Sequence, residues 1–287
     1  MPPFTTRLAE GWDRALDHLA LALVPVATAL LATDKIGAIA SFRGGHVGLR
    51  LGLPVGIVDL WQFVSLPNSS MTIGLPLPEA LPLAVVVVPL GILLQAALSA
   101  GYFGSLESAL RTGEFEFIVE VRRSFWPFLL YTVVPMVVAL PLALLGLADS
   151  RGLLPLLVVL VPVFLIAAYL FYATPYLIVL RDLDLLPAAR RSYALASEGG
   201  PYLRFAGGYA GFVLAVSLVT TAVVVNLGLA GVAIGVVALA PVGLAANATA
   251  MRFVADLDDR SPSLGGWPDG PADGASHDDD PALAPEP

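Results

Sequence analysis

The sequence contains no cysteine and a single lysine, Lys35. Without cysteine, the chain has no disulfide, no thiolate zinc site and no cysteine nucleophile, and its redox compartment stays undetermined. Charge of either sign is also scarce, because only 13% of the 287 residues are charged, whereas a soluble domain has roughly 25%. This shortage excludes a chain whose helices all face water and favours one that lies in lipid.

Long apolar runs take the place of the missing charge. Hydrophobic residues make up 57% of the chain, and the mean hydropathy is +0.82. A helix needs about 20 mostly apolar residues to cross about 30 Å of hydrocarbon. Transmembrane helices are predicted over residues 16–31, 81–103, 125–147, 153–180, 205–227 and 229–251.

The predicted fold is therefore an all-α integral membrane protein with about six transmembrane helices, contained in residues 1–254. The last two spans form one continuous apolar run. Asn226, Gly228 and Gly231 interrupt it, and these residue types favour a turn. We expect a tight hairpin of two spans here rather than one very long helix.

The distribution of cations predicts the orientation. With the N-terminus inside, eleven arginines fall in cytoplasmic segments, whereas the outer segments hold three arginines and Lys35. Cytoplasmic loops of membrane proteins carry the excess of Lys and Arg. We therefore expect a plasma-membrane protein with both termini in the cytoplasm.

Three segments outside the spans have a character of their own. Residues 7–19 carry apolar side chains at helical spacing, which predicts an interfacial helix before the first span. The outer loop, residues 34–79, is rich in Gly and Pro and half apolar, so we expect a short hairpin or a re-entrant cap on the membrane face. The tail, residues 255–287, has nine acidic residues against Arg260 and is predicted to be disordered.

The acidic, lysine-poor composition also bears on the source of the chain. Carboxylates hold their hydration well, so an acidic surface suits a salt-rich cytoplasm. This indicates a halophilic archaeon. The alternative is a GC-rich genome, which also favours Arg and Ala over Lys.

A short motif occurs twice at the predicted cytoplasmic face. Residues 122–125 read Arg-Arg-Ser-Phe and are followed by Pro-Phe-Leu, and residues 190–193 read Arg-Arg-Ser-Tyr and are followed by Pro-Tyr-Leu. The repetition predicts two related helix-loop-helix units. One interpretation is that the arginines contact anionic lipid headgroups. The plainer alternative is topology anchoring, since arginine and aromatic residues populate membrane interfaces in any case. The residues concerned are Arg122, Arg123, Arg190 and Arg191.

The second copy carries a family resemblance. The segments Tyr176-Leu-Ile-Val-Leu-Arg-Asp, Ala188-Ala-Arg-Arg-Ser-Tyr and Gly200-Pro-Tyr-Leu resemble a multi-pass family related to the membrane domain of glycerophosphoryl diester phosphodiesterase, and haloarchaeal membrane proteins of similar length. The resemblance covers about residues 153–211. It implies a membrane module without enzymatic activity, because no phosphodiesterase catalytic domain accompanies it.

Polar side chains inside the predicted spans are neutral, with Gln95, Thr174 and Asn247 as candidate intramembrane contacts. They would line a substrate path or form hydrogen bonds between helices, the commoner role. Ionisable groups, which mark pumps and secondary transporters, are almost absent from the spans. The three histidines lie apart and have no metal-ligand spacing.

The sequence thus predicts no catalytic residue, no metal site and no cofactor. The leading hypothesis is a non-enzymatic membrane protein that organises lipid or accompanies a partner protein, whose identity the sequence does not reveal. The expected partners are the lipid bilayer and anionic headgroups, without nucleic acid. The alternative is a transporter or permease-like subunit that lacks its own energy-coupling site.

Overall fold

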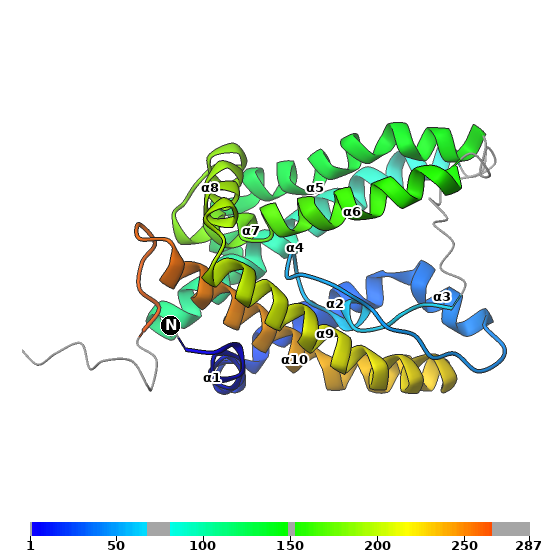
Figure 1. Cartoon of the computed structure of the whole chain (residues 1–287), viewed down its shortest axis with the longest axis horizontal. Helices are drawn as coiled ribbons and strands as arrows, with labels where there is room; N and C mark the ends of the chain where they lie inside the picture. Colours follow the sequence, from blue (N-terminus) through cyan, green and yellow to red (C-terminus); the bar gives the residue numbers. More distant parts are fainter. Residues whose placement is uncertain (1, 68–80, 149–152, 266–287) are drawn as a thin grey trace, which may run out of the picture.

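The computed structural model describes residues 2–67, 81–148 and 153–265, and these ranges contain helices and loops but no strand. The longer helices run side by side along the molecule (Figure 1). In chain order the helices are α1 (Phe4–Asp17), η1 (Leu19–Ala22), α2 (Leu23–Leu31), α3 (Thr33–Ser41), η2 (Leu60–Gln62), α4 (Leu81–Thr112), α5 (Phe117–Ala148), α6 (Leu153–Phe171), α7 (Thr174–Leu180), α8 (Leu185–Glu198), α9 (Pro201–Asn226) and α10 (Leu229–Leu257).

Five helical segments are long and apolar enough to cross a membrane, and a sixth is counted if α1, η1 and α2 form one bent span. The five are Val85–Thr112, Phe117–Leu140, Val159–Leu180, Pro201–Asn226 and Leu229–Leu257. The protein is therefore an all-α, multi-pass membrane protein, which confirms the predicted fold class.

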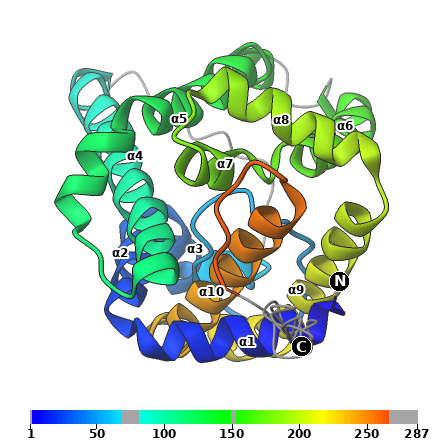
Figure 2. The same ribbon diagram turned by 90° about the vertical axis from the view of Figure 1, so that its left-hand side faces the viewer.

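The two ends of the helix bundle differ. We call one the arginine end; it carries α8 and the last turns of α4 and α10, and both α1 and α8 lie across it (Figure 2). We call the opposite one the hairpin end, because α9 turns into α10 there. Gly228 at this turn has a φ of 62°, which glycine adopts at little cost. The predicted hairpin in the last apolar run is confirmed.

The first predicted span, residues 16–31, begins later than expected. Leu16 belongs to α1, and the chain bends by 96° before Leu19–Leu31. On α1, Gly11 lies against Ala245 and Thr249 of α10, whereas Trp12 and Leu16 are exposed. A helix with one apolar face turned away from the protein suits the membrane interface. A helix is thus present as the separate element α1, and its place at the membrane interface stays a prediction.

The predicted span over residues 153–180 is also divided. α6 ends at Phe171, and α7 begins at Thr174 with Pro175 in its first turn. Proline has no backbone N–H to continue the hydrogen bonding of the preceding helix. All residues of α7 are buried, so this short helix lies in the centre of the bundle.

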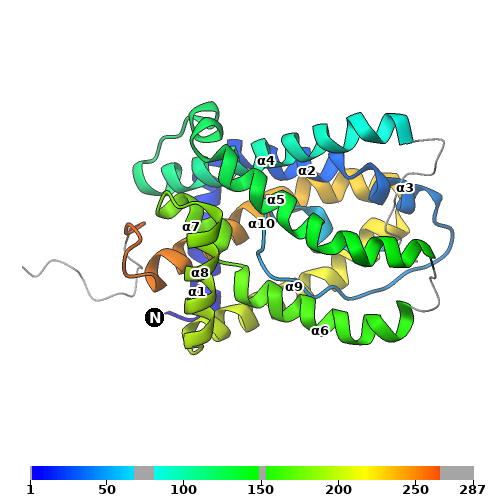
Figure 3. The same ribbon diagram turned by 90° about the horizontal axis from the view of Figure 1, so that it is seen from above.

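The chain between α3 and α4 enters the bundle instead of covering it. It leaves α3 at the hairpin end and passes between the helices (Figures 1 and 3). We call residues 46–65 the re-entrant loop. Five of its apolar side chains are at most 2% exposed, namely Val58, Leu60, Trp61, Phe63 and Val64. Of the two predicted forms the loop adopts the re-entrant one, but it lies within the bundle and not on its face.

Glycine allows this close approach. A Cβ atom added at Gly243 of α10 would lie 1.9 Å from the carbonyl oxygen of Val58, far inside van der Waals contact. A Cβ at Gly235 would lie 2.9 Å from Leu60 Cδ1. The loop backbone therefore packs directly on the α10 backbone, without intervening side chains.

The ordered part of the chain extends beyond residue 254, the predicted boundary of the membrane domain. α10 continues to Leu257, and both Asp258 and Leu264 are buried, at 1% and 3% exposure. The remainder of the predicted disordered tail, residues 266–287, lies outside the described residues.

Candidate functional site

Asn247 of α10 holds the deepest part of the re-entrant loop. Its Nδ2 donates to the carbonyl oxygen of Gly56 at 3.0 Å and to the hydroxyl of Tyr176 at 2.9 Å. Its Oδ1 accepts from the N–H of Val58 at 2.9 Å and from the hydroxyl of Tyr102 at 3.1 Å. An amide has two donor hydrogens and two acceptor lone pairs, so its hydrogen-bonding capacity is fully used.

Hydroxyl groups of α9 bind the two arms of the loop. Ser217 accepts from the N–H of Arg50 at 2.8 Å, and Thr221 accepts from the N–H of Ser65 at 2.9 Å. Two more side chains of α9 bond the loop backbone: Thr220 donates to Phe63 O at 2.7 Å, and Asn226 both accepts from His46 N at 2.8 Å and donates to His46 O at 2.9 Å.

Tyrosines of two other helices also bond the loop backbone. Tyr176 of α7 donates to Pro54 O at 3.1 Å, and Tyr131 of α5 donates to Val55 O.

These bonds explain why polar side chains occur inside apolar spans. Non-helical backbone is tolerated at membrane depth only where its N–H and C=O groups find partners within the protein. Most of the neutral polar residues of α9 and α10 supply such partners. Asn247 thus serves the loop, in addition to connecting α10 with α4 and α7 through the two tyrosines.

The other two predicted intramembrane contacts do not join this arrangement. Thr174 is 1% exposed, and its hydroxyl has no hydrogen-bond partner among the described residues. Gln95 lies near the middle of α4 and lines a cavity beside α2 and α3. The structure therefore separates the three residues into three different surroundings.

Charged groups nevertheless lie among the helices, on segments outside the predicted spans. Arg50 and Asp59 are carried between the helices by the re-entrant loop, and Lys35 of α3 lies close by. Asp59 Oδ1 accepts from the N–H of Trp61 at 2.9 Å, and the Lys35 ammonium lies 5.7 Å from the Trp61 ring centroid. A count of charges along the apolar runs misses these groups, because they belong to α3 and to the loop that follows it.

At the arginine end, the second arginine of each predicted pair is held by carboxylates. Arg123 lies 3.0 Å from Asp182 and 3.8 Å from Glu120. Arg191 lies 2.6 Å from Asp258 and 2.9 Å from Asp259. The Asp258 side chain is fully buried, and Arg191 and Arg181, the latter at 3.7 Å, together compensate its negative charge.

The first arginine of each pair behaves differently. Arg122 and Arg190 are exposed, and neither forms an ion pair with another residue in the part of the chain that the structure describes. Each motif thus has one arginine that forms no ion pair with the described residues and one that is paired with carboxylates.

The aromatic residues of the two motifs also correspond. Phe128 stacks on Phe103 with ring centroids 5.6 Å apart, and Tyr202 stacks on Tyr172 at 4.3 Å. The one clear difference is in the backbone. The first motif lies within the continuous helix α5, whereas the second is divided between α8 and α9 at Gly199 and Gly200.

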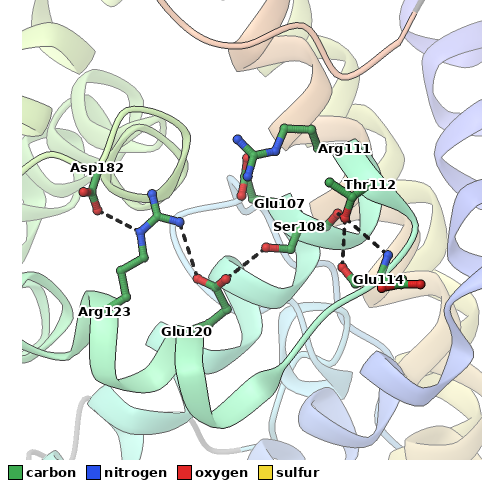
Figure 4. A network of polar contacts seen from close by, with 8 residues as sticks. All are labelled: Glu107, Ser108, Arg111, Thr112, Glu114, Glu120, Arg123 and Asp182. Carbon is green, nitrogen blue, oxygen red and sulfur yellow. Dashed lines mark hydrogen bonds and ion pairs between the residues drawn. The ribbon is translucent and has the colours of Figure 1, made fainter.

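A polar network connects the turn between α4 and α5 with the chain before α8 (Figure 4). Arg123 contacts both Glu120 of α5 and Asp182, and Glu120 accepts from the Ser108 hydroxyl at 3.0 Å. Beside this network, Glu107 of α4 is paired with Arg111 at 3.2 Å. No group of three or more His, Asp or Glu that would hold a metal ion occurs among the described residues.

A comparison with protein-family models, curated proteins and solved structures finds no match.

We predict that Asn247→Leu destabilises the protein. The change leaves two loop backbone groups and two tyrosine hydroxyls without their buried partner, and each such loss costs about 1–3 kcal/mol. The free energy of unfolding in detergent is expected to fall by about 3 kcal/mol or more, seen as a lower Tm. Thr132→Val is the matched control, because among the described residues the Thr132 hydroxyl bonds only the Phe128 carbonyl of its own helix. Equal Tm values for the two variants would contradict the role given to Asn247.

Proposed function

We propose that this chain is a non-enzymatic membrane protein that binds anionic lipid headgroups at its arginine end. The observation that carries the proposal is the unequal use of the two arginines in each motif. Arg123 and Arg191 are paired with carboxylates, whereas Arg122 and Arg190 are exposed and form no ion pair with the described residues. Arginine near a membrane surface attracts anionic headgroups.

The surroundings of the exposed arginines support this proposal. Trp126 is 70% exposed and Tyr193 is 53% exposed, and each follows an exposed arginine within four residues. Aromatic side chains of this kind settle at headgroup level in membrane proteins. An arginine beside such a residue is therefore placed where lipid phosphates lie.

The orientation belongs to the same proposal. The arginine end carries the arginine-rich segments and the described ends of the chain, so the positive-inside rule assigns it to the cytoplasm. The plasma membrane is the proposed location, and the inner leaflet is the proposed source of the anionic headgroups. The resemblance to the membrane domain of glycerophosphoryl diester phosphodiesterase agrees with a membrane module that has no catalytic domain.

The alternative is a transporter or permease-like subunit. A path between the two repeat units would support it, with Gln95 or Thr174 in its wall. The cavity beside Gln95 instead lies between α2, α3, the re-entrant loop and α4. We therefore place the lipid-binding module first.

We predict that the two kinds of arginine respond differently to substitution. Arg122→Gln combined with Arg190→Gln lowers the retention of phosphatidylglycerol by about thirty-fold, because each of the two arginines near an anionic surface contributes about 1 kcal/mol. The Tm stays unchanged. Native mass spectrometry of the detergent-solubilised protein measures the bound lipid.

The matched variant is Arg123→Gln combined with Arg191→Gln. It removes a partner from the buried Asp258 and lowers the free energy of unfolding by about 2 kcal/mol, while phosphatidylglycerol retention per folded molecule is kept. If the exposed pair could be replaced without loss of lipid, the arginines would be topology anchors only.

The orientation is testable because the chain has no cysteine. Single cysteines are placed at two exposed positions, Arg43→Cys at the hairpin end and Ser197→Cys on α8. A membrane-impermeant maleimide added to intact cells is expected to label Arg43→Cys and not Ser197→Cys. Lysis should then expose Ser197→Cys. The opposite labelling pattern would reject the proposed orientation.

A further inference from the structure

A cavity of about 560 Å³ lies between α2, α3, the re-entrant loop and α4. Its polar lining consists of Lys35, Asp59, Thr28 and Gln95, and its apolar lining includes Leu90 and Leu94 of α4. The arginine-end residues take no part in it, so it is separate from the proposed headgroup contacts.

The two charges in this cavity are opposite but not joined. Lys35 and Asp59 form no ion pair within 4.0 Å, either with one another or with other described residues. Asp59 has one oxygen bonded to the N–H of Trp61, and Arg50 from the loop and the Thr28 hydroxyl lie near it. Asp34 is the further carboxylate near Lys35. Charges inside a membrane are costly unless paired, so an occupant that pairs with both would stabilise them.

The surroundings of Gln95 also indicate that the cavity binds a polar group. It lies near the middle of a membrane-spanning helix, its side chain is exposed, and it forms no hydrogen bond with the described part of the chain. An amide that faces hydrocarbon without partners costs several kcal/mol. Such a side chain is tolerated when a polar group fills the adjoining cavity.

The apolar lining indicates from where the occupant enters. Leu90 is 62% exposed, Leu94 is 43% exposed and Val87 is 53% exposed, all on one membrane-spanning segment. Exposed apolar side chains on such a segment face lipid. The cavity is therefore bordered by the bilayer, and a molecule from the bilayer can place an apolar chain along this side of α4.

We propose that the cavity between Lys35, Asp59 and Gln95 binds the zwitterionic headgroup of a phospholipid that carries a primary ammonium. The lipid phosphate pairs with the Lys35 ammonium, and the lipid ammonium donates to the Asp59 carboxylate. Gln95 and Thr28 supply further hydrogen bonds, and an acyl chain lies along Leu90 and Leu94. An anionic lipid matches the site less well, because its headgroup offers no cation to Asp59.

The test uses the full chain in detergent with equal amounts of phosphatidylethanolamine and phosphatidylglycerol, and native mass spectrometry to measure the lipid retained. The wild type is expected to retain phosphatidylethanolamine at this site. Lys35→Gln and Asp59→Asn each weaken that retention by about ten-fold, the loss of one charge-assisted bond. Gln95→Leu weakens it less and is exposed enough to fold normally. The arginine-end variant Arg122→Gln with Arg190→Gln leaves phosphatidylethanolamine retention unchanged, which separates this site from the proposed function.

The most specific test is a variant with the two charges exchanged, Lys35→Glu combined with Asp59→Lys. A zwitterionic headgroup can reverse its direction, so the exchanged variant is expected to recover binding that either single change removes. Three results would overturn the proposal: retention of phosphatidylglycerol at least as strong through Lys35, retention unaffected by Asp59→Asn and Gln95→Leu, or equal binding of a soluble zwitterion such as phosphoethanolamine.

Discussion

The structure depends on one constraint, which is that backbone N–H and C=O groups inside a membrane need partners from the protein itself. The helices satisfy this requirement internally, but the re-entrant loop cannot. Asn247 satisfies it for the deepest residues of the loop, through bonds to Gly56 and Val58, and hydroxyls of α9 satisfy it along the arms. The same constraint accounts for Gly243, which lets the loop backbone approach α10 closely enough to reach Asn247.

Features that depend on residues close together in the sequence were predictable from it. The apolar runs, the hairpin at Gly228 and the interfacial helix before the first span all follow from local composition and spacing. The depth of the loop does not, because it rests on pairs such as Val58 with Asn247, which are 189 residues apart. Gln95, Thr174 and Asn247 were recognised as unusual for the same local reason. Which of them has a protein partner depends on the tertiary structure.

The arginine end shows the same division. The repeated motif was visible in the sequence, and both copies lie at one end of the bundle. The separation into arginines with and without ion pairs was not visible, because Asp182 and Asp258 come from other parts of the chain. That Asp258 is buried also explains why the chain remains ordered past the predicted boundary. Ion pairs thus hold the segments together at the arginine end, and the hydrogen-bonded loop connects the helices further along the bundle. The charged cavity forms where this loop lies beside α2, α3 and α4.

Amide hydrogen exchange of the re-entrant loop, measured with the protein in lipid nanodiscs, tests the central claim most directly. The N–H groups of Val58 and Ser65 are bonded to buried or helix-borne side chains, so we expect them to exchange as slowly as amides in the middle of α10. The amide of Gly45, in the exposed chain before the loop, should exchange fast. Equally fast exchange at Val58 and Gly45 would show that the loop does not lie within the bundle, and would contradict this account.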